Sequence, residues 1–141
     1  MRTKLAVVVV GLSLVRAAAP VSAHHSFAAE FDASKPIVLQ GAVTRIEWIN
    51  PHTWIHMEVK GADGKTVEWM IECGTPNTLL RRGIDKNSVP AGTLIVVDGY
   101  QAKNGSNRAN GRDVSLPSGK KLFVGSSGTG APSDARDPAE K

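Results

Sequence analysis

The four histidines of this chain fall into two clusters, and clustered imidazole rings are the groups in the sequence best suited to hold a transition metal. His24 and His25 are adjacent, whereas His52 and His56 lie four residues apart. Imidazole nitrogen is among the preferred ligands of Cu(II), which also heads the affinity order of the divalent first-row metals. The grouping therefore predicts a site for Cu(II), or for a related transition metal, built from these four side chains.

The first pair gains a further donor if the chain is cut directly before it. Residues 1–23 begin with two basic side chains, continue as an apolar run too short to span a bilayer comfortably, and end in small residues. This order is typical of a secretory signal peptide, so we expect cleavage after Ala23 and export to the periplasm. His24 would then chelate Cu(II) through its free amine and its ring. Alternatively, His25 would do so through its ring, an amide nitrogen and that amine.

The second pair cannot easily act as a unit. Strands rise about 3.3 Å per residue, so His52 and His56 would lie about 13 Å apart at Cα if both belonged to one strand. Two rings reach one metal over that separation only if the chain folds sharply at Pro51. We therefore expect one of the two histidines to join the amino-terminal pair. The alternatives are that His52 is a turn residue with local hydrogen bonds and that His56 is an ordinary residue on the surface of a strand.

A second kind of site is a binding surface without metal. From Trp54 onward the side chains alternate, which predicts a strand with Ile55 and Met57 facing the core and Trp54 and His56 on the opposite, accessible face. An exposed aromatic ring beside an imidazole is a candidate surface for a saccharide, a peptide or a partner protein. The candidate ligand-binding residues of this surface are Trp48, Trp54, Arg81 and Arg108. The alternative for Trp48 is a place in the core.

The elements that must position these residues are mostly short strands. Their expected ranges are strands 37–48, 54–60, 66–73, 93–102, 112–116 and 120–124, and a helix over 77–82 that Thr75 caps and Gly83 ends. A break in alternation near Gly41 predicts a β-bulge in the long first strand. Three strands, a short helix and then two or three strands predict an all-β fold, an OB-like Greek-key barrel of five or six strands with its helix between strands three and four. A small sandwich is the alternative.

The chain divides into four predicted segments. They are a signal peptide (1–23), an irregular amino-terminal arm (24–36), an OB-like domain (37–124) and a disordered tail (125–141) that is rich in Gly, Ser and Pro. The core is predicted from the apolar faces of the strands and the helix. Its expected members are Leu39, Val43, Ile55, Met57, Val59, Val67, Trp69, Ile71, Leu79, Leu94 and Val96.

Charge and cysteine content exclude several functions. The signal peptide holds 3 of the 17 basic residues, so the processed chain keeps 14 basic against 13 acidic residues. That balance lacks the basic footprint of a nucleic-acid-binding protein. Cys73 is the only cysteine, which excludes an internal disulfide, and strand parity predicts that it is buried and inert. No nucleophile elbow surrounds a serine. We therefore expect a non-enzymatic binding protein without a membrane span after processing, whose partner is a metal ion or a periplasmic protein.

Several short motifs give the chain a resemblance to a known family. They are His24 to Asp32, Gly41-x-Val43, Trp48-x-Asn50-Pro51-His52, Asn77-x-Leu79-x-Arg81-Arg82-Gly83 and Arg108-Ala109-Asn110-Gly111-Arg112. Together they resemble a family of short exported bacterial proteins of unknown function that open with His-His-Ser-Phe after the signal peptide. The resemblance covers most of residues 24–127 and implies a periplasmic β-barrel-like domain. It implies no activity, ligand or catalytic residue.

Overall fold

β1 (Phe31–Glu47) is the longest element of the structure and pairs with strands on both of its sides. The computed structural model describes residues 27–126, and the elements below belong to that range. The other elements are α2 (Phe27–Glu30), β2 (Trp54–Lys60), β3 (Thr66–Glu72), α3 (Pro76–Arg81), β4 (Leu94–Ala102), β5 (Arg108–Ser115) and β6 (Lys121–Phe123). An all-β protein with little helix is therefore confirmed.

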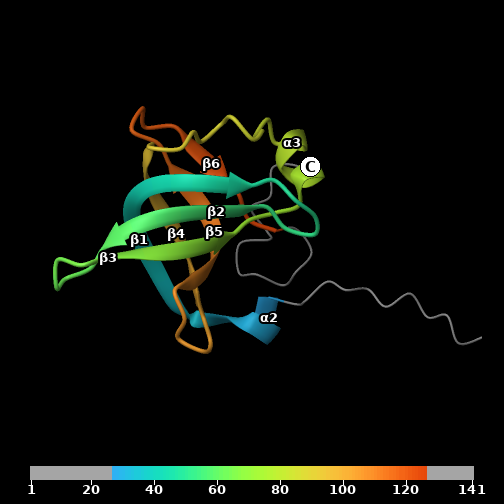
Figure 1. Cartoon of the computed structure of the whole chain (residues 1–141). Coiled ribbons are helices and arrows are strands. Elements are labelled where there is room, and N and C mark those ends of the chain that lie inside the picture. Colours follow the sequence, from blue (N-terminus) through green and yellow to red (C-terminus); the bar gives the residue numbers. More distant parts are fainter. Residues whose placement is uncertain (1–26, 127–141) are drawn as a thin grey trace, which may run out of the picture.

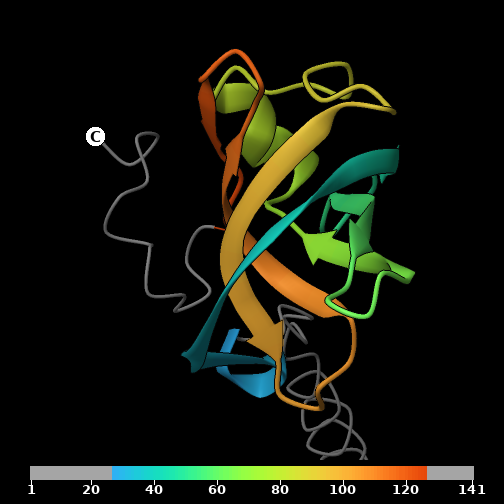
Figure 2. The same ribbon diagram turned by 90° about the vertical axis from the view of Figure 1, so that its left-hand side faces the viewer.

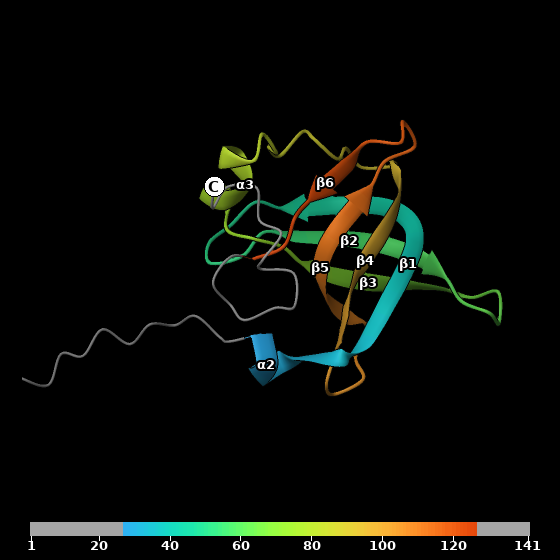
Figure 3. The same cartoon turned by 180° about the vertical axis from the view of Figure 1, so that it is seen from behind.

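The strands form one sheet in the order β3-β2-β1-β4-β5-β6, and β3 also pairs with β5. The β3–β5 pairing is parallel, and the other pairings are antiparallel. β1 curves through the molecule, so its first part lies beside β4 and its last part beside β2 (Figures 1 and 2). Figure 3 shows the same sheet from behind, with β5 and β6 toward the viewer. This path brings the end of β3 against the start of β5, where the candidate site lies.

The predicted bulge near Gly41 is displaced along β1. The register between β1 and β2 shifts between Val43 and Arg45, while Gly41 keeps its place opposite Val59. Gly41 is instead required by a close approach of two backbones, because a Cβ at this position would lie 2.0 Å from the carbonyl oxygen of Glu58. The shift matters for the site because it places Arg45 directly opposite His56.

The arm predicted over 24–36 is not irregular in its described part. Residues 27–30 form α2, and β1 already begins at Phe31 and continues through Pro36. The reason is a small second hydrophobic cluster, in which Phe27 and Phe31 pack against Tyr100 of β4. The ring centroids of Phe27 and Tyr100 are 5.4 Å apart in an edge-to-face arrangement. This cluster holds the start of the described chain against the sheet.

The core follows the prediction in β1 and α3, only in part in β2 and β3, and not in β4. Leu39, Val43, Ile55, Met57, Ile71 and Leu79 are buried. Leu94 and Val67 are exposed, and Val59, Trp69 and Val96 are only half-buried. In β4 the inward residues are Ile95 and Val97. The prediction fails here because the run Leu94–Val97 is apolar at every position, so the sequence does not show which residues face the core.

The helix between β3 and β4 forms where capping chemistry predicts it. Thr75 Oγ1 accepts a hydrogen bond from the backbone N–H of Thr78 at 3.1 Å, and Pro76 occupies the first turn. Gly83 follows with φ of +73°, the left-handed conformation that glycine adopts without strain. β5 starts at Arg108 rather than at residue 112, because its first residues pair with β3. Within residues 27–126, no helix is long and apolar enough to cross a membrane.

Candidate functional site

His52 lies between β1 and β2 and is buried against the end of β3. Its Nδ1 is 3.1 Å from the carbonyl oxygen of Cys73, which follows β3 directly. Two further oxygens surround the same nitrogen, Ser126 Oγ at 3.5 Å and Glu72 Oε1 at 3.9 Å. The backbone of Thr53 continues the β2–β3 pairing to Cys73 and Gly74, which fixes the ring's position relative to these groups.

These contacts determine which nitrogen of His52 is left to bind a ligand. A carbonyl oxygen only accepts hydrogen bonds, so Nδ1 must carry the hydrogen that it donates to Cys73. In a neutral ring Nε2 then carries the lone pair, and no hydrogen-bond partner for Nε2 occurs among the described residues. An imidazole that donates its other N–H to a backbone carbonyl has the usual arrangement of a metal-binding histidine.

Glu72 extends the site across the seam between β3 and β5. Its carboxylate accepts a hydrogen bond from Asn110 Nδ2 at 3.4 Å, and both residues are buried. Burial raises the pKa of Glu72 above its usual range, while the nearby charges of His52 and Arg108 act in the opposite direction. The negative charge of Glu30 adds to the rise. Glu30 belongs to α2, so the start of the described chain is electrostatically coupled to the carboxylate that faces His52.

Arg108 connects α2 to the predicted aromatic surface. Its Nη2 is 3.1 Å from Glu30 Oε2, and its guanidinium carbon lies 5.1 Å from the centroid of the Trp54 ring. Trp54 stands opposite Glu72 in the β2–β3 pairing and is half-buried. The structure thus brings Trp54 and Arg108 together, with the guanidinium over the ring.

The other members of the predicted aromatic surface lie elsewhere. Trp48 is half-buried and packs against the main core. Arg81 is exposed on α3 and donates a hydrogen bond to Thr78 Oγ1 at 3.3 Å. α3 and the start of β5 lie at opposite ends of the molecule (Figures 1 and 2). Of the four candidate residues, only Trp54 and Arg108 form a common surface.

His56 is buried, which corrects the prediction that it stands on an accessible face. Its side chain is 1% exposed. Its Nδ1 lies 2.8 Å from Glu68 Oε1 and its Nε2 lies 3.1 Å from Glu47 Oε1. Arg45 Nη2 is 3.2 Å from the same Nε2 and 3.0 Å from Glu47. The ring is therefore covered by three charged side chains, and neither of its nitrogens is left to bind a metal in this arrangement.

The contacts of His56 join three strands. Arg45 and Glu47 come from β1, His56 from β2 and Glu68 from β3. The hydrogen bond from His56 lowers the pKa of Glu68 below its usual range, and the positive charge of Arg45 lowers it further. Because a carboxylate only accepts, His56 Nδ1 donates to Glu68. We call these four residues the His56 cluster.

The described residues do not by themselves make a metal site. Among residues 27–126, no group of three or more His, Cys, Asp or Glu side chains is placed to hold a metal ion. His24 and His25 lie outside the described residues, as do the predicted signal peptide (1–23) and the predicted tail from residue 127 onward. Gly125 and Ser126, also assigned to the tail, are buried.

Hydrolytic chemistry finds no support at His52. Ser126 and Glu72 approach the same ring nitrogen, Nδ1, whereas a nucleophile and an orienting acid need one nitrogen each. Cys73 is buried, and burial raises the pKa of its thiol, which disfavours the thiolate that a nucleophile would need. Sequence reasoning missed Glu72, Asn110 and Glu30 as neighbours of the site, since they meet only through the β3–β5 pairing and the position of α2.

The described residues thus define a small all-β domain with one buried histidine that presents a ring nitrogen and another that is held by charged neighbours. The chain belongs to the family of unknown function DUF6152, whose family model matches residues 11–111. Membership of an uncharacterised family, expected from the motifs, is therefore confirmed. Comparison with curated proteins and with solved structures gives no match.

Proposed function

We propose that this protein is an exported, non-enzymatic binding protein that holds Cu(II) at its processed amino terminus, with His52 as an additional ring ligand. Cleavage after Ala23 would free the amine of His24 beside two imidazole rings, which is a strong chelate for Cu(II). His52 Nε2 would complete the site. The ligands are thus the amine and the ring of His24 or His25, followed by the ring of His52.

The observation that supports this proposal is the hydrogen bond from His52 Nδ1 to the carbonyl oxygen of Cys73. It fixes the tautomer and the orientation of the ring before any metal arrives, so little conformational freedom remains to be lost on binding. The start of the described chain is held near Glu72, because Glu30 of α2 pairs with Arg108 and its negative charge acts on the Glu72 carboxylate. His24 is three positions before Phe27, which gives the segment a reach of about 10 Å.

We further propose that the fold is an OB-like barrel. Its support is the parallel β3–β5 pairing, which closes the order β3-β2-β1-β4-β5 upon itself, and the position of α3 between β3 and β4. Proteins with this fold bind saccharides and oligonucleotides on the face of strands two and three and the adjoining loops. In such a barrel Trp54, with Arg108 above it, would lie on that face, which favours a saccharide or peptide site as the second candidate function.

Calorimetric titration of Cu(II) into the processed chain tests the copper proposal. We expect one strong site, and binding that weakens as the pH falls below about 6.5, because protons compete for imidazole nitrogens. The matched control carries Gly-Ser-Gly before His24. This extension removes the native amine chelate and leaves the sheet untouched, so affinity should fall at least about a hundredfold, or 2.8 kcal/mol.

Two results would reject the copper site. One is equal affinity of the processed and extended forms, and the other is affinity no greater than that of a short peptide containing histidine. Intact mass of the secreted protein must accompany the titration, since a mature start other than His24 removes the amine from the site. In any of these cases the Trp54 surface becomes the first candidate, to be tested with saccharide and peptide arrays.

A further inference from the structure

Charge is distributed unevenly over the described part of the molecule. α3, the segment 82–93 and the β5–β6 hairpin over 116–121 lie at one end, which we call the basic end (Figures 1 and 2). This end contains five basic residues and one acidic residue, whereas the remainder of residues 27–126 contains seven basic and nine acidic residues. The basic residues are Arg81, Arg82, Lys86, Lys120 and Lys121. The described part of the molecule is therefore a charge dipole whose positive pole is formed by these three segments.

Most of these charges face solvent. Arg81, Lys86, Lys120 and Lys121 are exposed, while Arg82 is half-buried with its guanidinium carbon 4.6 Å from the centroid of the Phe123 ring. The single acid, Asp85, is occupied by local hydrogen bonds from the backbone of Asn87 and the hydroxyl of Ser88. Among residues 27–126, this end contains no other acidic side chain to neutralise the positive potential of the exposed lysines.

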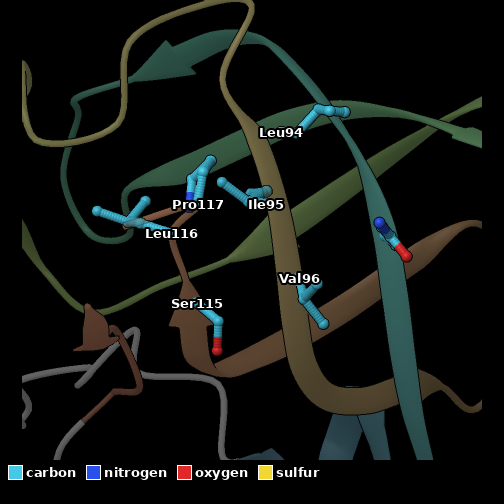
Figure 4. A pocket seen from close by; sticks show the side chains of 7 residues that line it. Leu94, Ile95, Val96, Ser115, Leu116 and Pro117 are labelled. Carbon is cyan, nitrogen blue, oxygen red and sulfur yellow. The ribbon is translucent and has the colours of Figure 1, made fainter. Parts of the chain in front are cut away.

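Exposed apolar side chains accompany the charges. Leu80 on α3 is 52% exposed and Leu94 at the start of β4 is 59% exposed. Leu94 lines a shallow groove of about 260 Å³ together with Leu116 and Pro117, which belong to the same hairpin as the two lysines (Figure 4). The backbone N–H of Leu116 donates to the carbonyl of Lys120 at 2.9 Å, which places the apolar and the basic side of the hairpin next to each other.

We propose that the basic end docks on a bilayer surface rich in anionic phospholipid. Leucines beside lysines and arginines are the combination that binds such surfaces, with the charges at the phosphates and the apolar side chains between the headgroups. The groove is smaller than the 300–1,000 Å³ of ordinary ligand pockets. The charges also extend over three segments, which a broad flat partner contacts together and a single peptide does not. The proposal does not depend on metal binding.

Vesicle co-sedimentation of the processed chain tests this docking. The vesicles contain equal parts of phosphatidylglycerol and phosphatidylcholine, with pure phosphatidylcholine for comparison. We expect binding only to the anionic vesicles, weakened by added salt. Lys120→Glu with Lys121→Glu should lower the partition coefficient at least about tenfold, since each basic residue near the surface contributes substantially. Lys60→Glu with Lys65→Glu is the matched control, because it changes the net charge equally in the exposed β2–β3 hairpin.

Three outcomes would overturn the proposal. They are failure to bind anionic vesicles at low salt, equal loss in the two double variants, and binding to soluble polyglutamate without binding to vesicles. The last result would assign the basic end to an acidic polypeptide. Circular dichroism of both variants confirms that each is folded, and Leu94→Ser should weaken the vesicle binding that remains at high salt.

Discussion

His52 and His56 are separated by only three residues, yet their surroundings differ in kind. His52 has one nitrogen held by a neutral backbone carbonyl and the other without a partner among the described residues. His56 has both nitrogens beside charged side chains from neighbouring strands. Burial alone therefore does not distinguish a binding histidine from a structural one. What distinguishes them is whether a ring nitrogen remains for a ligand after the protein has satisfied the ring.

The largest stability effect should come from His56. Its replacement by Ala removes hydrogen bonds to charged partners in β1 and β3 and leaves a space under Arg45. Hydrogen bonds to charged groups contribute about 1.5–3 kcal/mol each and are not additive, so we expect a loss of about 2–3 kcal/mol. Urea unfolding measures it. A change below about 0.5 kcal/mol would mean that the cluster does not hold the strands together.

His52→Ala should cost less. The change removes the hydrogen bond to the carbonyl of Cys73 and the longer one, of 3.5 Å, to Ser126 Oγ. The carbonyl of Cys73 keeps a donor because Ser126 Oγ lies 3.3 Å from it. A neutral hydrogen bond contributes about 1 kcal/mol, so the free energy of unfolding should fall by about that amount. The same urea experiment gives the value. If His52→Ala destabilises the protein more than His56→Ala, the roles of the two histidines are reversed.

The smallest effect concerns the pH dependence of the His56 cluster. The pKa of Glu68 is lowered in the folded protein, so the ionised carboxylate favours folding above its ordinary pKa of 4.5. That contribution should disappear as the pH falls through the lower pKa of the folded state. We therefore expect Glu68→Gln to lower the melting temperature slightly at pH 7 and to leave it unchanged near pH 3. A difference that persists undiminished at pH 3 would contradict this assignment.

The sequence predicts well the strand β2 and the helix α3 that lie on either side of β3. Alternation from Trp54 places Ile55 and Met57 in the core, and capping chemistry locates α3 within one residue. Alternation fails in β4, where four consecutive apolar residues carry no parity. It also misplaces His56, because an outward residue is buried whenever long charged side chains from adjacent strands cover it.

The surroundings of His52 could not be read from the sequence. Its contacts come from Cys73 and Ser126, which are 21 and 74 positions away along the chain. Glu72 meets Asn110 only because β3 pairs with β5. No local sequence pattern predicts a parallel pairing between strands that are so far apart along the chain. The structure of the arm is also missed because it depends on a distant contact, the packing of Phe27 on Tyr100. Non-local contacts therefore decide the part of the molecule on which the proposed function depends.

A copper titration of three processed proteins, the wild type, His52→Gln and His56→Gln, tests the role of His52 most directly. The substitution at His52 should weaken Cu(II) binding at least about tenfold, or 1.4 kcal/mol, because it removes the free ring nitrogen. The substitution at His56 should change the affinity less than about twofold while lowering stability. Unchanged affinity in His52→Gln, or equal loss in both variants, would contradict the assignment of His52 as the ligand.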